Sequence, residues 1–260
     1  MLNYLSVLAL YVLLAFSGTT KASEHNRIEI LVGMGERPPF LFAEDDRGAG
    51  PDILQAMNLT QNKFVFIPKK IPTRRRQQAF EELWVDIVMW DNPIWDWGDQ
   101  QLEKSLPLIH SRDIYIAKRS SVSSPKFFDD IKKMSIAIVN GYQYNLFNFE
   151  TDINQITKAY DVIQARTEEA AIKLLLVNRA KIAIISQTSV NWFIKSNGLS
   201  ESIFAVAPFV DSTYARYFLI PKSAPISSSE INDILHSAQQ KGLLAPIYRR
   251  YGLPLPKFKQ

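Results

Sequence analysis

Short runs rich in β-branched and aromatic residues alternate along this chain with segments of helical periodicity. The helical period is clearest in residues 168–178 and 230–240, where apolar side chains recur three and four positions apart. This alternation predicts an α/β fold with mixed, largely parallel sheets, whose ligands bind beyond the carboxyl ends of the strands. The predicted strands are residues 28–32, 64–67, 86–89, 114–117, 135–139, 182–185 and 217–220.

A polar, proline-rich loop follows the first predicted strand and leads into a helix. Pro38 and Pro39 hold this loop extended, because each ring fixes its own φ and disfavours helical geometry at the residue before it. Phe40 is therefore presented from a rigid turn. Residues 45–50 then contain the aspartates and glycines that are typical of turns, and Pro51 starts a helix with apolar residues on one face.

In this order, a strand, an aromatic-bearing loop, a glycine turn and a helix resemble the opening of bacterial extracellular solute-binding proteins of the amino-acid-binding type. The tail is similar to that family's closing pattern, which ends in a last helix and a Tyr-Gly pair, here Tyr251 and Gly252. The resemblance implies a periplasmic-binding-protein fold of two lobes joined by a hinge, with the ligand clamped between them. It covers residues 33–57, 83–118, 128–144, 168–189 and 218–252.

The length of the chain exceeds what one typical core requires, which agrees with two lobes. The polar segment 120–125 follows a predicted strand and is typical of a crossover between lobes. A return crossing is expected near residues 205–208. Lobe one should then comprise residues 27–119 and 207–260, and lobe two residues 120–206.

Residues 1–22 form an apolar run followed by small and polar residues, with Thr20 and Ala22 at the spacing that a signal peptidase recognises. We expect a secretory signal peptide that is cleaved after Ala22, and a protein located in the periplasm. The alternative is an uncleaved membrane anchor, although the apolar core is shorter than the about 20 residues that a membrane span needs.

The composition is that of a soluble globular protein, with 47% hydrophobic and 22% charged residues and no cysteine. The formal net charge of +4 is too small to indicate a nucleic-acid partner. The one basic run, residues 69–76, fits a solvated helical turn with one functional arginine better than a nucleic-acid site. We expect a monomer that binds a small molecule and needs neither a cofactor nor a metal.

Two loops of lobe one carry the residues that we expect to contact a ligand. Phe40 either stacks on the ligand or fills the core of the lobe. Residues 90–97 hold three tryptophans and two aspartates, and aromatic faces beside carboxylates suit a cation or a sugar-like ring. The alternative is that these tryptophans fold a long loop onto the lobe. The candidates are Glu36, Arg37, Phe40, Trp90, Asp91 and Asn92.

The sequence departs from the resembled family at the two contacts that hold an α-amino acid. That family places an arginine for the α-carboxylate after this strand, but no arginine lies between Trp90 and Ser105. Ser186 stands where the family has an aspartate for the α-amino group. These differences argue against a simple α-amino acid as ligand, and Arg75 or Arg112 are the candidates to replace the missing arginine.

Lobe two offers two further groups of candidates. One follows the strand 135–139 and resembles the family's glycine-led start of a helix, whose backbone N–H groups bind an oxygen. The alternative is that its polar side chains only cap this helix. Asp211, in the segment that returns to lobe one, is a weaker candidate, and we interpret it as an exposed turn residue rather than a ligand contact. The candidates in lobe two are Gly141, Tyr142, Gln143, Ser186 and Gln187.

Catalysis has little support in the sequence. His25, His110 and His236 are scattered without metal-ligand spacing, and the sequence has neither a nucleophile elbow nor a phosphate-binding glycine loop. A remote alternative on this fold is a dehydratase-like enzyme with Glu36 or Asp91 as general acid.

We therefore expect a periplasmic solute-binding protein rather than an enzyme. It should capture a small polar ligand, an amino acid or a related amine or acid, by lobe closure for the permease of an ABC-type transporter. The alternative is a ligand-sensing module that signals to a membrane receptor. The gene neighbourhood separates the two, because a transporter component lies beside genes for a permease and an ATPase.

Overall fold

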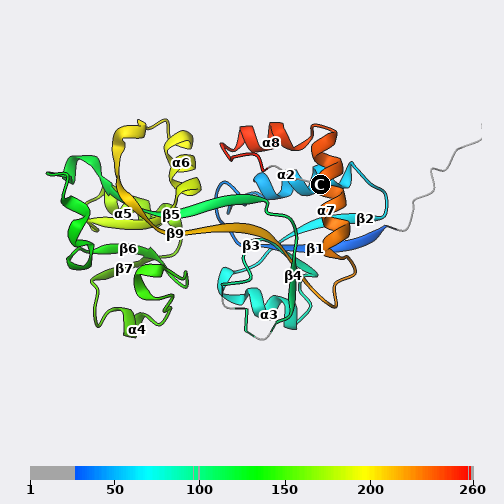
Figure 1. The fold of residues 1–260 in the computed structure, drawn as a ribbon, viewed down its shortest axis with the longest axis horizontal. Coiled ribbons are helices and arrows are strands. Elements are labelled where there is room, and N and C mark those ends of the chain that lie inside the picture. The colour runs from blue at the N-terminus through cyan, green and yellow to red at the C-terminus, as the bar shows by residue number, and fades with distance from the viewer. Residues whose placement is uncertain (1–26, 96, 99, 257, 259–260) are drawn as a thin grey trace, which may run out of the picture.

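The computed structural model describes residues 27–95, 97–98, 100–256 and 258, so the predicted signal peptide lies outside the described residues. The described chain forms two lobes that lie side by side along the long axis of the molecule (Figure 1). Two long strands, β5 (Ile109–Lys118) and β9 (Phe204–Pro221), run through both lobes and pair antiparallel with each other. The predicted two-lobed α/β fold is confirmed.

The first lobe is built on strands in the order β2-β1-β3-β9, where β1 is parallel to β2 and β3, and β9 is antiparallel to β3. Apolar residues of α2, α7 and α8 pack on one face of this sheet, and those of α3 pack on the other (Figure 1). The strands are β1 (Ile28–Met34), β2 (Phe64–Lys70), β3 (Ile87–Asp91) and β4 (Leu102–Lys104), and the helices are α2 (Ala49–Asn58), α3 (Arg76–Glu81), α7 (Ser228–Gln240) and α8 (Leu244–Arg250).

The second lobe continues the sheet in the order β9-β5-β8-β6-β7, with β6 parallel to both β7 and β8. Helices α5 and α6 cover one face, and the segment around η4 and α4 covers the other. The strands are β6 (Ile136–Val139), β7 (Val162–Ala165) and β8 (Ile182–Ser186), and the helical segments are η3 (Phe127–Lys133), η4 (Asn145–Phe147), α4 (Ile153–Ile156), α5 (Glu168–Leu176) and α6 (Gln187–Ser196).

The chain changes from one core to the other within β5 and β9. Ile109 belongs to the core of the first lobe, whereas Ile114 belongs to that of the second. On β9, Phe204 lies in the second core and Phe218 in the first. The β5–β9 register shifts on both sides of Ile114, so the ladder is irregular where it passes between the lobes. The residue boundaries of the lobes stay predictions.

The predicted strands and helices are confirmed, with ends that differ by a few residues. Helix α5 begins where the Thr167 side chain caps it, and α7 begins at a capping box of Ser227 and Glu230. The features that were not predicted include the short strands β4 and β7, the helices α4 and α6, and the length of β9, which has 18 residues. The glycine-led helix expected after β6 is wrong, because only the 3-10 turn η4 forms there.

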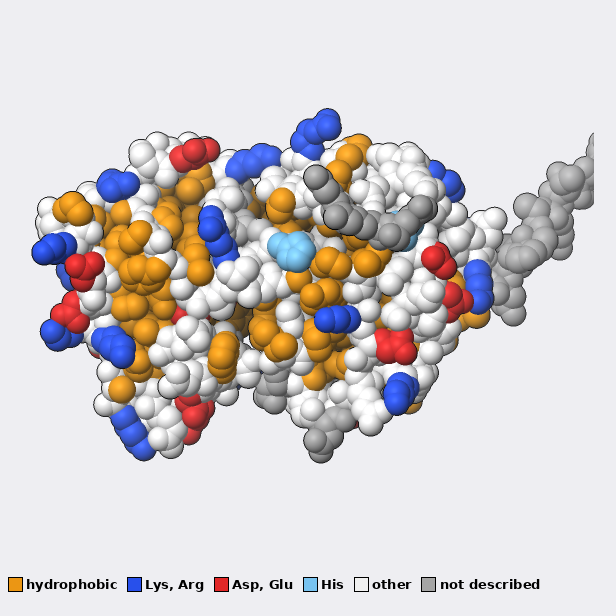
Figure 2. Space-filling model, in the orientation of Figure 1, with side chains coloured by type: hydrophobic (Ala, Val, Ile, Leu, Met, Phe, Trp, Pro, Cys, Tyr) orange, Lys and Arg blue, Asp and Glu red, His pale blue; other side chains and the backbone are white. Residues whose placement is uncertain are grey.

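Lysine and arginine side chains are scattered over both lobes on the face shown in Figure 2, and the outline is notched between the lobes along its lower edge. Among the described residues, none of the helices combines the length and the apolar character that crossing a membrane requires.

Candidate ligand-binding site

Arg37 extends from the loop after β1 toward the second lobe. Its Nε donates to the Tyr142 hydroxyl at 2.8 Å and lies 3.7 Å from Oε2 of Glu168, so it touches two residues of the other lobe. Burial alone would lower the pKa of Arg37, but the interactions with Tyr142 and Glu168 outweigh it and raise that pKa. Arg37 is therefore a charged link between the lobes.

Glu168 is the partner of Arg37 and begins helix α5. Its side chain is buried, with Oε1 accepting from the Ser186 backbone N–H at 2.9 Å and Oε2 from the Ser189 hydroxyl at 2.6 Å. The Ser189 oxygen also lies 3.2 Å from the carbonyl oxygen of Pro38, on the same loop as Arg37. Ser186 itself caps α6. Glu168 thus ties two elements of the second lobe to the first-lobe loop.

Arg216, on β9, is buried at 2% exposure in a cage of aromatic rings. Its guanidinium lies 4.6 Å from the Trp95 ring centre and 4.8 Å from that of Tyr214. It donates to the Trp90 carbonyl at 3.1 Å and to the Tyr214 hydroxyl at 3.1 Å. Arg216 was not predicted from the sequence, and it places a second positive charge at the junction of the lobes.

Asp113 lies on β5 at the irregular part of the ladder. It accepts a hydrogen bond of 2.6 Å from the Tyr214 hydroxyl and a weaker one of 3.3 Å from Ser212. Burial raises the pKa of Asp113 to about 6, although the Tyr214 hydrogen bond and the charge of Arg216 both lower it. The carboxyl group therefore titrates close to physiological pH.

A pH dependence of stability follows from Asp113. Its pKa is raised above the ordinary 3.8, so its contribution is fully present below about pH 4 and is lost as the pH rises through about 6. Between pH 5 and pH 8 we expect this group to remove about 1.5 kcal/mol from the free energy of unfolding. Denaturant unfolding at both pH values should show a smaller decrease for Asp113→Asn than for the unchanged protein. Equal decreases would contradict the assignment.

The tryptophans of the segment 90–97, which begins within β3, have two different roles. Trp90 stacks on Phe40 with ring centres 4.5 Å apart, and Trp97 packs on Phe80 at 5.2 Å, so both belong to the first-lobe core. Trp95 instead meets Tyr214 edge-on at 5.0 Å and forms part of the Arg216 cage.

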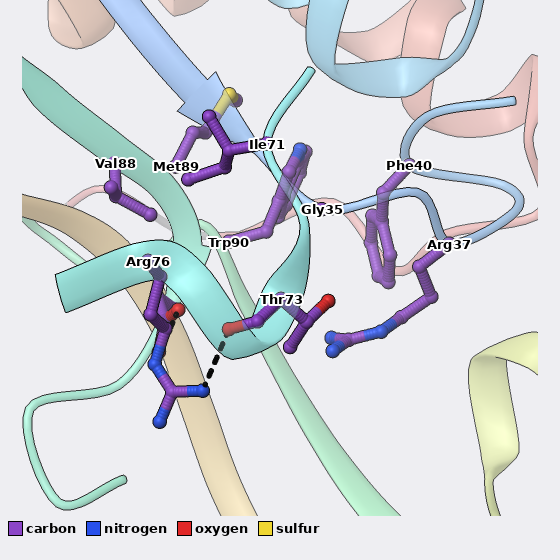
Figure 3. A pocket seen from close by; sticks show the side chains of 10 residues that line it. Gly35, Arg37, Phe40, Ile71, Thr73, Arg76, Val88, Met89 and Trp90 are labelled. Atoms are coloured by element: carbon purple, nitrogen blue, oxygen red, sulfur yellow. Dashed lines mark hydrogen bonds and ion pairs between the residues drawn. The ribbon is translucent and has the colours of Figure 1, made fainter. Parts of the chain in front are cut away.

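A small cavity lies against Phe40 and Trp90 at the carboxyl ends of β1 and β3 (Figure 3). Its volume of about 20 Å³ is close to the roughly 15 Å³ that one water molecule requires. In Figure 3 the side chain of Thr73 lies between those of Arg37 and Arg76. The space beside these aromatic rings is thus nearly filled by protein.

A larger cavity of about 190 Å³ lies between the lobes and shares Arg76 with the smaller one. It is lined from both lobes, by residues of η1 (Thr73–Arg75) and α3 on one side and by the loop after β6 on the other. It has room for a small solute. The lining residues are Arg74, Arg76, Gln77, Gly141, Gln143 and Thr151.

The candidates predicted in the first lobe are distributed unevenly. Arg37, Phe40, Trp90 and Asp91 line the small cavity. Asn92 is buried and donates to the Ala215 carbonyl at 2.7 Å, which ties the loop to β9. The exposed candidates, which line neither cavity, are Glu36, Arg75 and Arg112.

The candidates predicted in the second lobe lie nearer to the lobe junction. Gly141 and Gln143 line the large cavity, and Tyr142 contacts Arg37. Ser186 is buried beside Glu168, and Gln187 accepts a hydrogen bond of 2.6 Å from Arg112 at the surface. The charged or hydroxyl groups at the lobe junction that the sequence did not single out include Arg74, Arg76, Asp113, Glu168, Ser189, Tyr214 and Arg216.

Asp211 is not the exposed turn residue that the sequence suggested. It is buried at 5% exposure and accepts from the backbone N–H groups of Asn145 and Leu146 at 2.8 and 3.0 Å. It also accepts from the Tyr115 hydroxyl at 2.6 Å. The backbone N–H groups at the start of η4 are thus bonded to this internal carboxylate.

The sequence matches no protein-family model and no curated protein. Among solved structures, it is similar to the GluR0 ligand-binding core from Nostoc punctiforme in complex with L-glutamate, at 15% identity and a TM-score of 0.67, over 86% of this chain and 100% of that one. The fold is that of the two-lobed periplasmic binding proteins.

Two other structures with this binding-protein fold extend the comparison. The arginine-, lysine-, histidine-binding protein ArtJ from Geobacillus stearothermophilus is 18% identical, with a TM-score of 0.66 over 89% of this chain and 100% of that one. An ABC uptake transporter substrate-binding protein from Streptococcus pneumoniae with bound histidine is 16% identical, with a TM-score of 0.68 over 86% of this chain and 92% of that one.

Proposed function

We propose that this protein binds a small polar solute between its two lobes and hands it to the permease of an ABC-type transporter. The observation that carries the proposal is the 190 Å³ cavity, because residues of both lobes line it. The contacts of Arg37 with Tyr142 and Glu168 join the two lobes, and they would favour closure around this cavity. Binding of this kind requires no catalytic residue, and the protein acts in the periplasm as a monomer.

The structural neighbours support this proposal. One is described as the substrate-binding protein of an amino acid ABC transporter, and another as an ABC uptake transporter substrate-binding protein with bound histidine. Both share the fold with this chain at less than a fifth of identical residues, so they support solute binding as a class and leave the solute to be derived from the site.

Thermal unfolding with a panel of amino acids, polyamines, organic acids and short sugars tests the proposal. A solute at 100 times its dissociation constant adds about 2.7 kcal/mol to the free energy of unfolding, which corresponds to a shift of several degrees for a protein of this size. We expect one chemical class to raise the unfolding temperature. Small-angle scattering should then show a smaller radius of gyration with that solute. A flat response of the folded protein across the whole panel would contradict solute binding.

A sensing role uses the same site and a different partner. It is favoured by the likeness to a structure described as a ligand-binding core rather than as a transporter component. Co-purification with a permease separates the roles, because only a transporter component should bind one in a solute-dependent way.

A further inference from the structure

Helix α6 of the second lobe contacts the hydrophobic cores of both lobes. Figure 1 shows it at the edge of the second lobe that faces the first, on the same side of the molecule as α2 and α8. Val190 and Phe193 of this helix belong to the second-lobe core, whereas Trp192 packs against the core of the first lobe. The helix therefore joins the lobes through a side chain that its own lobe does not use.

Trp192 meets two aromatic rings of the first lobe. Its ring centre lies 5.5 Å from that of Phe42, in the loop after β1, and 5.9 Å from that of Tyr251, directly after α8. Phe42 and Tyr251 are 6.2 Å apart, so the three rings form a triangle across the lobe junction. Aromatic pairs at such separations stabilise a contact beyond the burial of their surface.

The two first-lobe rings are held in place by contacts within that lobe. Tyr251 is buried, and its hydroxyl donates to the Asp52 carboxylate of α2 at 3.1 Å. The backbone N–H of Phe42 donates to the Arg47 carbonyl at 2.8 Å, which closes the loop that carries the ring. The first lobe therefore presents a fixed surface to Trp192.

Polar contacts extend along the same side of α6. One turn before Trp192, the Ser189 hydroxyl lies 3.2 Å from the Pro38 carbonyl oxygen, and one turn after it, Lys195 Nζ donates to the Arg250 carbonyl at 3.0 Å. Helical residues three positions apart are neighbours, so the contact with the first lobe runs along about two turns of α6. Arg250 ends α8, where the carbonyl groups attract a cation.

The three rings lie outside the space that is available to a solute. Phe42, Trp192 and Tyr251 line neither of the two cavities described above. Each partner in the contact belongs to the protein itself, so no group of a solute is needed to complete it.

We propose that Trp192, Phe42 and Tyr251 form an aromatic clasp that closes a share of the molecules before any solute binds. A contact made only in the closed form favours that form, so the clasp raises the affinity for a solute that it does not touch. This inference deepens the proposed function, since lobe closure is the step that captures the solute.

A distance measurement between two spin labels on the solute-free protein tests the clasp. The sequence has no cysteine, so Lys173→Cys on α5 and Asp233→Cys on α7 place one exposed label on each lobe. We expect one population at the label separation of this structure and a second at a longer separation. Trp192→Ala should lower the ratio of closed to open molecules about 10-fold, and small-angle scattering should then give a larger radius of gyration.

Trp84 provides a matched control. It is a partly buried tryptophan that packs against the first-lobe core beside α3, and it precedes β3, so it lies at the end of that strand away from the small cavity. Trp84→Ala removes the same side chain and should leave the ratio unchanged. Phe42→Ala removes the first-lobe partner of Trp192 and should act in the same direction as Trp192→Ala, so the test does not depend on the folding of one variant.

Three results would overturn the clasp: the absence of a closed population in the unchanged protein, the same distance distribution in Trp192→Ala and Phe42→Ala as in the unchanged protein, or an equal shift in Trp84→Ala. The last would reduce the effect to a general loss of packing. Because the measurement uses no solute, each of these results leaves solute binding to be judged by the thermal panel above. A flat panel would in turn overturn solute binding and leave the clasp intact.

Discussion

Replacing Glu168 by alanine is expected to lower the free energy of unfolding by about 3 kcal/mol. The change leaves the buried Ser186 N–H without its acceptor and Arg37 without its counter-charge, and both losses are costly in a site with little water. The Glu168 side chain is 5% exposed, so solvent cannot take over its contacts. Denaturant unfolding measures the loss directly.

Glu169 provides a matched control for this experiment. It is the next residue on the same helix and pairs with Lys173 at 2.6 Å, but its side chain is 48% exposed. Exposed pairs of this spacing contribute about 0.5 kcal/mol or less, so Glu169→Ala should change the stability little. If the two alanine variants lost the same stability, the contacts of Glu168 would contribute no more than the exposed pair of Glu169 does. A double-mutant cycle of Arg37→Met with Glu168→Gln isolates the interlobe pair.

Asp211→Ala is the second change with a large expected effect, a loss of about 2 to 4 kcal/mol. The carboxylate accepts from two backbone N–H groups of η4 and from the Tyr115 hydroxyl, and the variant removes all three acceptor contacts at once. Burial of Tyr115 and its bond to Asp211 raise the pKa of that hydroxyl, so it remains a donor over the working pH range. Thermal and denaturant unfolding report the loss.

Two further variants separate the contributions of the hydrogen bonds that Asp211 accepts. Asp211→Asn keeps one acceptor oxygen and should lose less stability than the alanine variant. Tyr115→Phe removes only one of the three donors and should lose about 1 kcal/mol. If Tyr115→Phe alone matched Asp211→Ala, the backbone groups of η4 would not depend on this carboxylate.

The sequence was sufficient to predict the lobes and most strands, because apolar periodicity reports which face of an element is buried. It did not predict the charged groups at the lobe junction. Asp113 and Arg216 lie within the paired strands β5 and β9, and their positions depend on how these strands register, which is a tertiary property. Glu168 follows a capping threonine, so its sequence context resembles that of any acidic first turn of a helix.

The basic run 69–76 shows that neighbouring residues of one run can differ in whether they line the cavity. The sequence favoured Arg75, whereas Arg74 and Arg76 line the larger cavity and Arg75 does not. The short 3-10 segment η1 ends at Arg75 and α3 starts at Arg76, so the direction of successive side chains changes at this point. Single-sequence periodicity cannot locate such a junction to within one residue.

The segment 90–97 combines core packing with a cation contact. Trp90 and Trp97 pack into the lobe, as the alternative stated, and Trp95 faces a cation, although the other hypothesis placed that cation in the ligand. That cation is Arg216 of the protein itself. The hypothesis placed a cation or a sugar-like ring of the ligand on these rings, and aromatic composition could not indicate that Arg216 would occupy one of them.

If the protein binds a solute by lobe closure, as proposed, the pairing of β5 with β9 has a consequence for how strongly the solute has to bind. Both connections between the lobes belong to one antiparallel ribbon, whose register irregularity lies at Ile114, between the two cores. A bend at this point would leave most of the backbone ladder intact, so the open and closed forms would differ mainly in the side-chain contacts across the cleft, such as those of Arg37 and Ser189. A free-energy gap made of so few contacts amounts to a few kcal/mol, and a solute that prefers the closed form by a similar amount is enough to invert the populations.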